Sequence, residues 1–310
     1  KLVKAAYQVG DKRSFVFEGY SERGTPDQSI FATAVAINER VVAFVQDDLR
    51  ADTNNLDNDE IQQVINEFRN DIELITSIFG APSDVDGDGK VLFLFTHLVD
   101  DIGLGGFYDF SSVLPVENGG NGNHADMMFI SPSLGVAYCR SLLVHELQHL
   151  INYNQHVIVR SGQSEESWLN EGLSHLSEDL VENGFQNGGN QDRIRDFLSQ
   201  PGTVGLMGAN LNGAKRGAVY LFVRSLVDRL GQDVIQRLVQ TGLADRDNIE
   251  TASGEKFEGL LAVWAAQIYA SGNGLVDHPR LNYAFNLLHT SAGRGFPLPT
   301  TLQFSPESGF

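Results

Sequence analysis

Cysteine is almost absent from this chain of 310 residues, since Cys139 is the only one. A single cysteine excludes an intramolecular disulfide, and it also excludes a zinc site built on a CxxC pair. Any transition-metal site in the chain must therefore rely chiefly on histidine nitrogens and carboxylate oxygens.

Long apolar runs and basic residues are also scarce. No run approaches the roughly 18 to 20 apolar residues that span a bilayer, and the longest stretches, such as Val91–Phe95, have the length of a strand. Lys and Arg number 22 against 40 Asp and Glu, so the formal net charge is −18. Because such a field repels phosphate, we expect neither nucleic acid nor an acidic membrane as a partner. We also expect a monomer without a membrane span.

The composition is that of an ordinary globular protein, with 42% apolar and 20% charged residues. The chain begins with Lys1 instead of Met, and Lys1–Gly10 lacks the apolar core of a signal peptide. These features favour a mature or excised fragment of a longer precursor. They allow secretion without showing it, and a secreted, extracellular protein is our expectation.

Strand-like segments come first along the chain and helical patterns come second. Phe31–Ile37, Val41–Val45, Val91–Phe95 and Ala125–Ile130 favour strands, and apolar spacing predicts a helix over Ile61–Phe79. Further helices are expected at Cys139–Asn154, Glu166–Val181, Ala214–Leu230, Asp233–Thr241 and Glu255–Ala270. This order favours an α+β fold with a mixed α/β N-terminal lobe and a mostly helical C-terminal lobe.

The most informative segment is Leu143–Leu150, which reads LVHELQHL and contains HExxH within an apolar helical pattern. Because His145 and His149 are four residues apart, their imidazoles project from one helix face about one turn apart. Such a pair suits two corners of a tetrahedral zinc site. Glu146 points to the side and can reach a metal-bound water without being a ligand. The alternative is a buried helix with two incidental histidines.

A two-histidine site needs a third protein ligand, and the segment Trp168–Ser174 reads WLNEGLS. HExxH followed by WLNEG resembles the gluzincin zinc peptidases, and this resemblance implies that Glu171 is the third ligand. The separation from His149 is 171 − 149 = 22 positions, which is similar but not identical to the gap in the thermolysin and aminopeptidase N families. A metzincin is excluded, because its third histidine would stand where this chain has Gln155.

Other segments are similar to the hyicolysin family of secreted bacterial peptidases. They are Asp84–Lys90 before an apolar strand, Gly105–Phe107, Asp126–Met128 and Gly217–Leu221, and the likeness covers about residues 40 to 270. The resemblance implies a thermolysin-like, two-lobed zincin. Residues 1–155 would be the N-terminal lobe ending in the HExxH helix, and residues 156–310 the helical C-terminal lobe, together forming one catalytic domain.

The resemblance further implies a zinc-dependent endopeptidase that acts on a protein or peptide substrate. Zinc would polarise the scissile carbonyl and acidify a bound water, and Glu146 would act as the general base. A hydrogen-bond donor must then stabilise the oxyanion of the tetrahedral intermediate. In related peptidases a Tyr or His of the later lobe does this, which makes Tyr220 and His175 candidates. Tyr220 fits a core aromatic residue equally well.

Residues that hydrogen-bond to the ligand imidazoles without binding the metal should orient them. Glu178 lies two helical turns after Glu171 and faces the same way, so it is a candidate acceptor for a ligand histidine. A solvated helix carboxylate is its alternative. Thermolysin-like sequences often place an Asp four residues after the ligand Glu, where this chain has His175. Ser174, which has a smaller side chain, is an alternative candidate for the orienting role.

Calcium is a second candidate cofactor. Asp84, Asp86 and Asp88 with Gly89 resemble the opening of a calcium loop, but the bidentate Glu of an EF-hand is replaced by Phe95. A tight turn before a strand is the favoured alternative.

The substrate is expected to lie against an edge strand by main-chain pairing. Leu104–Asp109 is the candidate strand, because Gly105 and Gly106 permit close backbone approach. An ordinary buried strand is the alternative.

Three rival functions remain open. The first is an aminopeptidase of the same clan, although the chain has no GxMEN segment of the kind that captures a free amino terminus. The second is a surface binding module with a structural metal, against which Glu146 argues, since a structural site has no use for that carboxylate. The third is a calcium-stabilised binding protein without zinc chemistry.

Overall fold

The computed structural model describes residues 7–19, 27–181, 188–208 and 211–271, together with residue 278 and residues 281–283. They belong to two compact units, Lys1–Val159 and Arg160–Phe310. The first unit combines a sheet with helices and the second is helical, so the predicted α+β class is confirmed.

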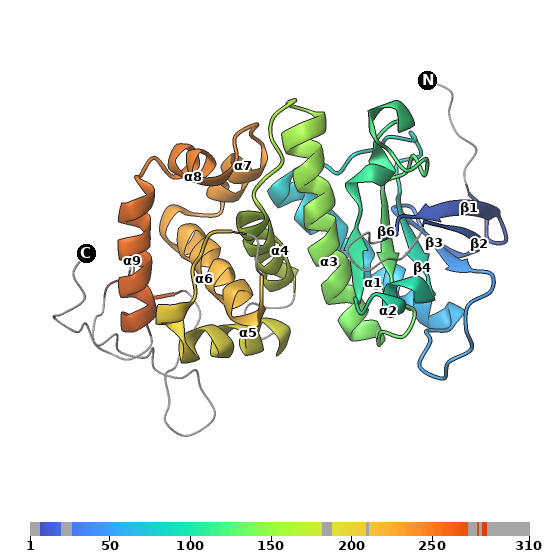
Figure 1. Ribbon diagram of the computed structural model, residues 1–310, viewed down its shortest axis with the longest axis horizontal. Helices are drawn as coiled ribbons and strands as arrows, with labels where there is room; N and C mark the ends of the chain where they lie inside the picture. Colours follow the sequence, from blue (N-terminus) through green and yellow to red (C-terminus); the bar gives the residue numbers. More distant parts are fainter. Residues whose placement is uncertain are drawn as a thin grey trace. The chain divides into compact units, whose positions relative to one another are not determined.

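A mixed six-stranded sheet forms the centre of the first unit (Figure 1). Its strands lie in the order β1-β2-β3-β4-β6-β5. Their bounds are β1 (Lys12–Phe17), β2 (Gln28–Ile37), β3 (Val41–Gln46), β4 (Val91–Phe95), β5 (Gly106–Tyr108) and β6 (Met127–Ile130). The strands β3, β4 and β6 pair in parallel, whereas β1, β2 and β5 pair antiparallel with their neighbours. Every residue of β4 and β6 is buried, as expected for strands covered on both faces.

The described residues of the first unit include the α-helices α1 (Asn58–Phe79), α2 (His97–Asp101) and α3 (Val136–Tyr153). The helix α1 begins at a capping box in which Asp57 and Glu60 bond each other's backbone N–H groups, and it ends at Gly80. It packs against α3 and the sheet, where the ring of Phe68 lies 5.2 Å from that of Phe93. A short π-helical turn, Asn154–Ile158, continues α3.

The second unit contains α4 (Ser167–Val181), α5 (Gly188–Ser199), α6 (Gly213–Leu230), α7 (Asp233–Val239), α8 (Asp245–Ser253) and α9 (Phe257–Ala270). Two glycines bring its central helices together. A Cβ on Gly172 of α4 would lie 2.9 Å from the carbonyl oxygen of Val219 in α6, and a Cβ on Gly217 of α6 would overlap the carbonyl of Arg193 in α5. Only glycine permits such close backbone approach. The glycines after Glu171 and Arg216 are therefore packing residues.

Among the described residues, no helix combines the length and the apolar character that crossing a bilayer requires.

Candidate functional site

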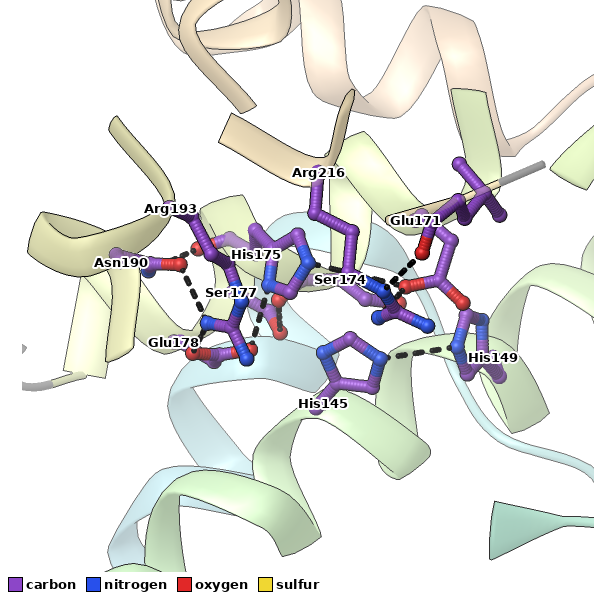
Figure 2. A network of polar contacts seen from close by, with 11 residues as sticks. His145, His149, Glu171, Ser174, His175, Ser177, Glu178, Asn190, Arg193 and Arg216 are labelled. Atoms are coloured by element: carbon purple, nitrogen blue, oxygen red, sulfur yellow. Dashed lines mark hydrogen bonds and ion pairs between the residues drawn. The ribbon is translucent and has the colours of Figure 1, made fainter. Parts of the chain in front are cut away.

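The two histidines of the HExxH segment meet on one face of α3. Their Nε2 atoms are 3.2 Å apart, and the two rings are nearly perpendicular at 84° (Figure 2). Two nitrogens bound to one tetrahedral zinc ion at about 2.0–2.1 Å would stand about 3.3 Å apart. The pair His145 and His149 therefore fits two corners of such a site in both donor type and spacing.

Burial of α3 explains why these side chains are held in place. Leu143, Leu147 and Leu150 are completely buried, so they fix the rotation of the helix against the core. His145 and Glu146 are 7% and 6% exposed, so both are buried on the same helix. The apolar face of α3 therefore fixes the positions of its polar side chains. Burial of such polar groups costs free energy unless they have hydrogen-bond or metal partners.

The carboxylate of Glu146 is anchored to the edge strand. The backbone N–H of Tyr108 in β5 donates to Glu146 Oε2 at 2.8 Å. The observed strand Gly106–Tyr108 lies within the predicted segment Leu104–Asp109, and it stands at the end of the strand order, as an edge strand does. Its residues are half-buried and not fully enclosed.

The free side of β5 carries backbone hydrogen-bonding groups. Ser131 N–H donates to the carbonyl of Gly105 at 2.8 Å. Since bonded and non-bonded pairs alternate along an antiparallel ladder, the pair Phe107–Phe129 is also bonded. The N–H and C=O groups of Gly106 and Tyr108 therefore turn away from β6, which is consistent with the bond from Tyr108 to Glu146.

In the second unit, Glu171 lies in a network of charged side chains on α4, α5 and α6 (Figure 2). Arg216 of α6 donates to Glu171 Oε2, and His175 Nε2 lies 3.8 Å from the same oxygen. His175 Nδ1 is 2.8 Å from Glu178 Oε1, and Arg193 lies 3.5 Å from the other oxygen of Glu178. The sequence pattern did not indicate the contact between Arg216 and Glu171, because these residues are 45 positions apart.

The predicted histidines and glutamates of the site lie on two helices. His145, Glu146 and His149 share α3 of the first unit, whereas Glu171, His175 and Glu178 share α4 of the second. Glu178 bonds His175 of its own helix. Its predicted role in orienting a ligand histidine stays a prediction.

Tyr220 and His175 are both completely buried in the second unit. Burial, followed by the nearby carboxylate of Asp179, raises the pKa of the Tyr220 hydroxyl well above its ordinary value. That hydroxyl is therefore a neutral donor at physiological pH. The assignment of Tyr220 or His175 to oxyanion stabilisation stays a prediction.

The acidic segment before β4 has features of both a turn and an ion site. One carboxylate oxygen from each of Asp84, Asp86 and Asp88 lies within 4.8 Å of the others. The same segment is a turn in which Asp84 accepts from Gly89 N–H at 3.0 Å and Asp88 accepts from the N–H of the next-but-one residue at 2.8 Å. The predicted tight turn is present, and calcium binding stays a prediction.

A buried carboxylate, that of Asp126, accepts hydrogen bonds from residues beside this turn. Asp126 is 1% exposed and accepts hydrogen bonds from the Ser83 hydroxyl and from Val85 N–H. Burial raises the pKa of Asp126 to about 6, although both hydrogen bonds act in the opposite direction. Asp126 therefore has a structural task, which is to hold the turn against β6.

Sequence similarity to a known protein covers part of the chain. The chain is 32% identical over 127 residues to the neutral metalloprotease ShpI of Staphylococcus hyicus. The name of that relative is the name of a metal-dependent protease. The match takes in 37% of this chain and 29% of the length of that relative. No protein-family model matches the chain.

A metal-dependent protease is a hydrolase that acts on proteins or peptides, and it needs a metal ion, commonly zinc. The paired histidines of α3 meet that requirement in their chemistry and spacing.

Proposed function

We propose that this protein is a zinc-dependent endopeptidase of the gluzincin type, resembling the hyicolysin family. One observation carries the proposal: His145 and His149 bring their Nε2 atoms to 3.2 Å on the helix that also holds Glu146 against an edge strand. A structural metal site has no use for the carboxylate between them. The two lobes, residues 1–155 and 156–310, would form one secreted catalytic domain.

The proposed zinc ligands are His145, His149 and Glu171. Two imidazoles and one carboxylate are a common ligand set of catalytic zinc, which keeps a fourth position for water or substrate. When bound, zinc supplies a Lewis acid that polarises the scissile carbonyl and lowers the pKa of water. Arg216 holds one oxygen of Glu171 and so restricts the orientation of that carboxylate.

Glu146 is assigned the role of general base. Tyr108 N–H fixes its Oε2 atom, so the carboxylate is oriented before substrate arrives. We assign to its Oε1 atom the acceptance of a proton from the attacking water and its delivery to the leaving amine. Fixing the carboxylate in advance reduces the reorganisation that proton transfer requires.

The substrate backbone is proposed to pair with the free side of β5. Gly106 turns its N–H and C=O groups to that side, two residues before the N–H of Tyr108 that holds Glu146. An extended peptide added there would run past the general base.

Gly106→Ala tests this pairing, and Gly105→Ala is its matched control. A Cβ on Gly106 would lie 2.8 Å from both Leu142 Cδ2 and the Phe129 carbonyl oxygen, whereas a Cβ on Gly105 would meet nothing closer than 3.5 Å. Because β5 must shift in the first variant, we expect its kcat/KM on a quenched peptide to fall by roughly 100-fold. The control should stay within about twofold of the native protein. Equal values for the two variants would rule out a role for β5.

The proposed function is tested by measuring zinc stoichiometry together with casein cleavage. We expect close to one zinc ion per chain, cleavage that a chelator abolishes, and recovery when zinc is restored. Removal of a catalytic zinc should eliminate nearly all turnover. Casein left intact by fully zinc-loaded protein would contradict a broad endopeptidase.

An internally quenched peptide with a blocked amino terminus separates the rival functions. An endopeptidase cleaves it, whereas an aminopeptidase requires the free amino group. A binding module with a structural metal would retain zinc and cleave neither peptide.

A further inference from the structure

We propose that Phe110 and Tyr153 form a subsite for a large apolar side chain of the peptide substrate, about three residues from the scissile bond. We call this pair the aromatic platform. The proposal rests on the proposed endopeptidase function, and it deepens that function by naming residues that determine specificity. All the residues that carry it belong to the first unit.

The aromatic platform is a stacked pair of rings. The ring centroids of Phe110 and Tyr153 are 5.3 Å apart with an interplanar angle of 28°, and the Tyr108 ring lies 6.4 Å from Tyr153. Although it is stacked, Phe110 remains 53% exposed. An exposed aromatic ring supported on its far side offers an apolar surface to a further side chain.

Hydrogen bonds hold the platform in place. Phe110 is the first residue of a short 3-10 helix, Phe110–Val113, which Asp109 caps by accepting from Ser111 N–H at 2.9 Å. The amide of Asn121 donates to the hydroxyls of Ser111 and Ser112 at 2.8 and 2.9 Å. A ring fixed in this way loses little conformational entropy when it binds a partner.

The edge strand and the catalytic helix run in the same direction along this surface. A Cβ on Gly105 would lie 3.5 Å from Tyr138 Cε1, near the start of α3. A Cβ on Gly106 would lie 2.8 Å from Cδ2 of Leu142, one turn further along α3.

The same alignment continues to the general base and the platform. Tyr108 N–H reaches Glu146, and beyond it Phe110 stacks on Tyr153 in the last turn of α3. The free side of β5 therefore leads from Glu146 to the aromatic platform.

Helix geometry sets the distance between the general base and the platform. Glu146 and Tyr153 are 153 − 146 = 7 residues apart, which is about 10 Å along a helix. An extended peptide advances about 3.3 Å per residue. A peptide with its scissile bond at Glu146 would thus bring its third residue to the platform. Because the platform is apolar and aromatic, it should favour Phe, Tyr or Leu over Ala or Asp at that residue.

The experiment uses the zinc-loaded full chain and a set of quenched peptides that share one scissile bond. Phe replaces Ala at one position at a time, from one to four residues on either side of that bond, and mass spectrometry confirms the cut. The native protein should prefer Phe by roughly 10-fold in kcat/KM at about the third position on one side. Phe110→Ala should abolish that preference mainly through KM and leave the all-Ala peptide within about twofold.

Tyr138→Ala is the matched control, since Tyr138 is also an exposed aromatic residue of this surface, 58% exposed, at the other end of β5. It should leave the preference at that position unchanged, and Phe110→Leu should restore part of it. A preference that survives Phe110→Ala, or a native protein with no preference at that distance, would overturn the subsite while leaving the endopeptidase intact. Failure to cleave any peptide would instead overturn the proposed function.

Discussion

Glu146→Gln is expected to retain zinc and to lose hydrolysis by about 100- to 10,000-fold in kcat, the range that general acid–base catalysis contributes. The amide has the shape of the carboxylate but cannot take a proton from the attacking water. Its oxygen can still accept from Tyr108 N–H, the bond that anchors Glu146 to β5. Folding and metal binding should therefore be preserved. The measurements are kcat/KM on a quenched peptide, zinc per chain by elemental analysis, and the urea midpoint of unfolding.

Glu117→Gln is the control for this variant, because Glu117 is an exposed carboxylate on the short 3-10 helix Val116–Asn118. It should keep native activity. Near-native turnover in the Glu146 variant would remove the general base from the mechanism. A variant that has lost both zinc and activity would show that Glu146 supports the metal site and would leave its proton-transfer role without support.

Glu171→Gln is expected to weaken zinc binding by about 100-fold or more, since an uncharged amide replaces an anionic ligand. The amide oxygen can still accept from Arg216, so α4 and α6 should remain packed through Gly172. The dissociation constant is measured by competition with a chromophoric chelator. Thermal unfolding in the absence of zinc checks that the fold is unchanged.

Glu166→Gln serves as the matched control, because Glu166 is exposed and stands just before the first turn of the same helix. It should bind zinc as the native protein does. Unchanged metal content in the Glu171 variant after dialysis against a chelator would exclude Glu171 as a ligand. In that case the two histidines would need a different third ligand.

Local patterns predicted the elements that bury a regular apolar face. The apolar spacing of Ile61–Phe79 predicted α1, which begins three residues earlier at its capping box. The continuous apolar run Val91–Phe95 predicted β4 without error at either end, because a strand covered on both faces has no polar positions. The helix α3 likewise follows its predicted segment, Cys139–Asn154, but starts at Val136.

The elements that the sequence did not reveal have weak local signals. The strand β1, Lys12–Phe17, begins with exposed polar residues and is stabilised by pairing with β2. The helix α5 is mostly polar, and its few apolar side chains are buried by packing against other helices, among them α6 and α9. In both cases long-range packing outweighs local propensity.

In the candidate site, too, local sequence determined some features and long-range packing determined others. The sequence by itself determined that His145 and His149 share one helix face, because their four-residue spacing and the helical repeat require it. It also excluded a zinc site built on a CxxC pair, since Cys139 is the only cysteine of the chain. These conclusions depend only on residue type and local geometry.

Tertiary structure alone decided which groups surround those residues. The N–H of Tyr108 reaches Glu146 across 38 positions, and Arg216 reaches Glu171 across 45. Such contacts depend on how a strand edge meets a helix and how closely two helices pack at Gly172. The aromatic platform is of the same kind, since Phe110 and Tyr153 meet only after β5 has aligned with α3. Residue spacing does not predict the distances in these three contacts, because packing between segments far apart in the chain sets them.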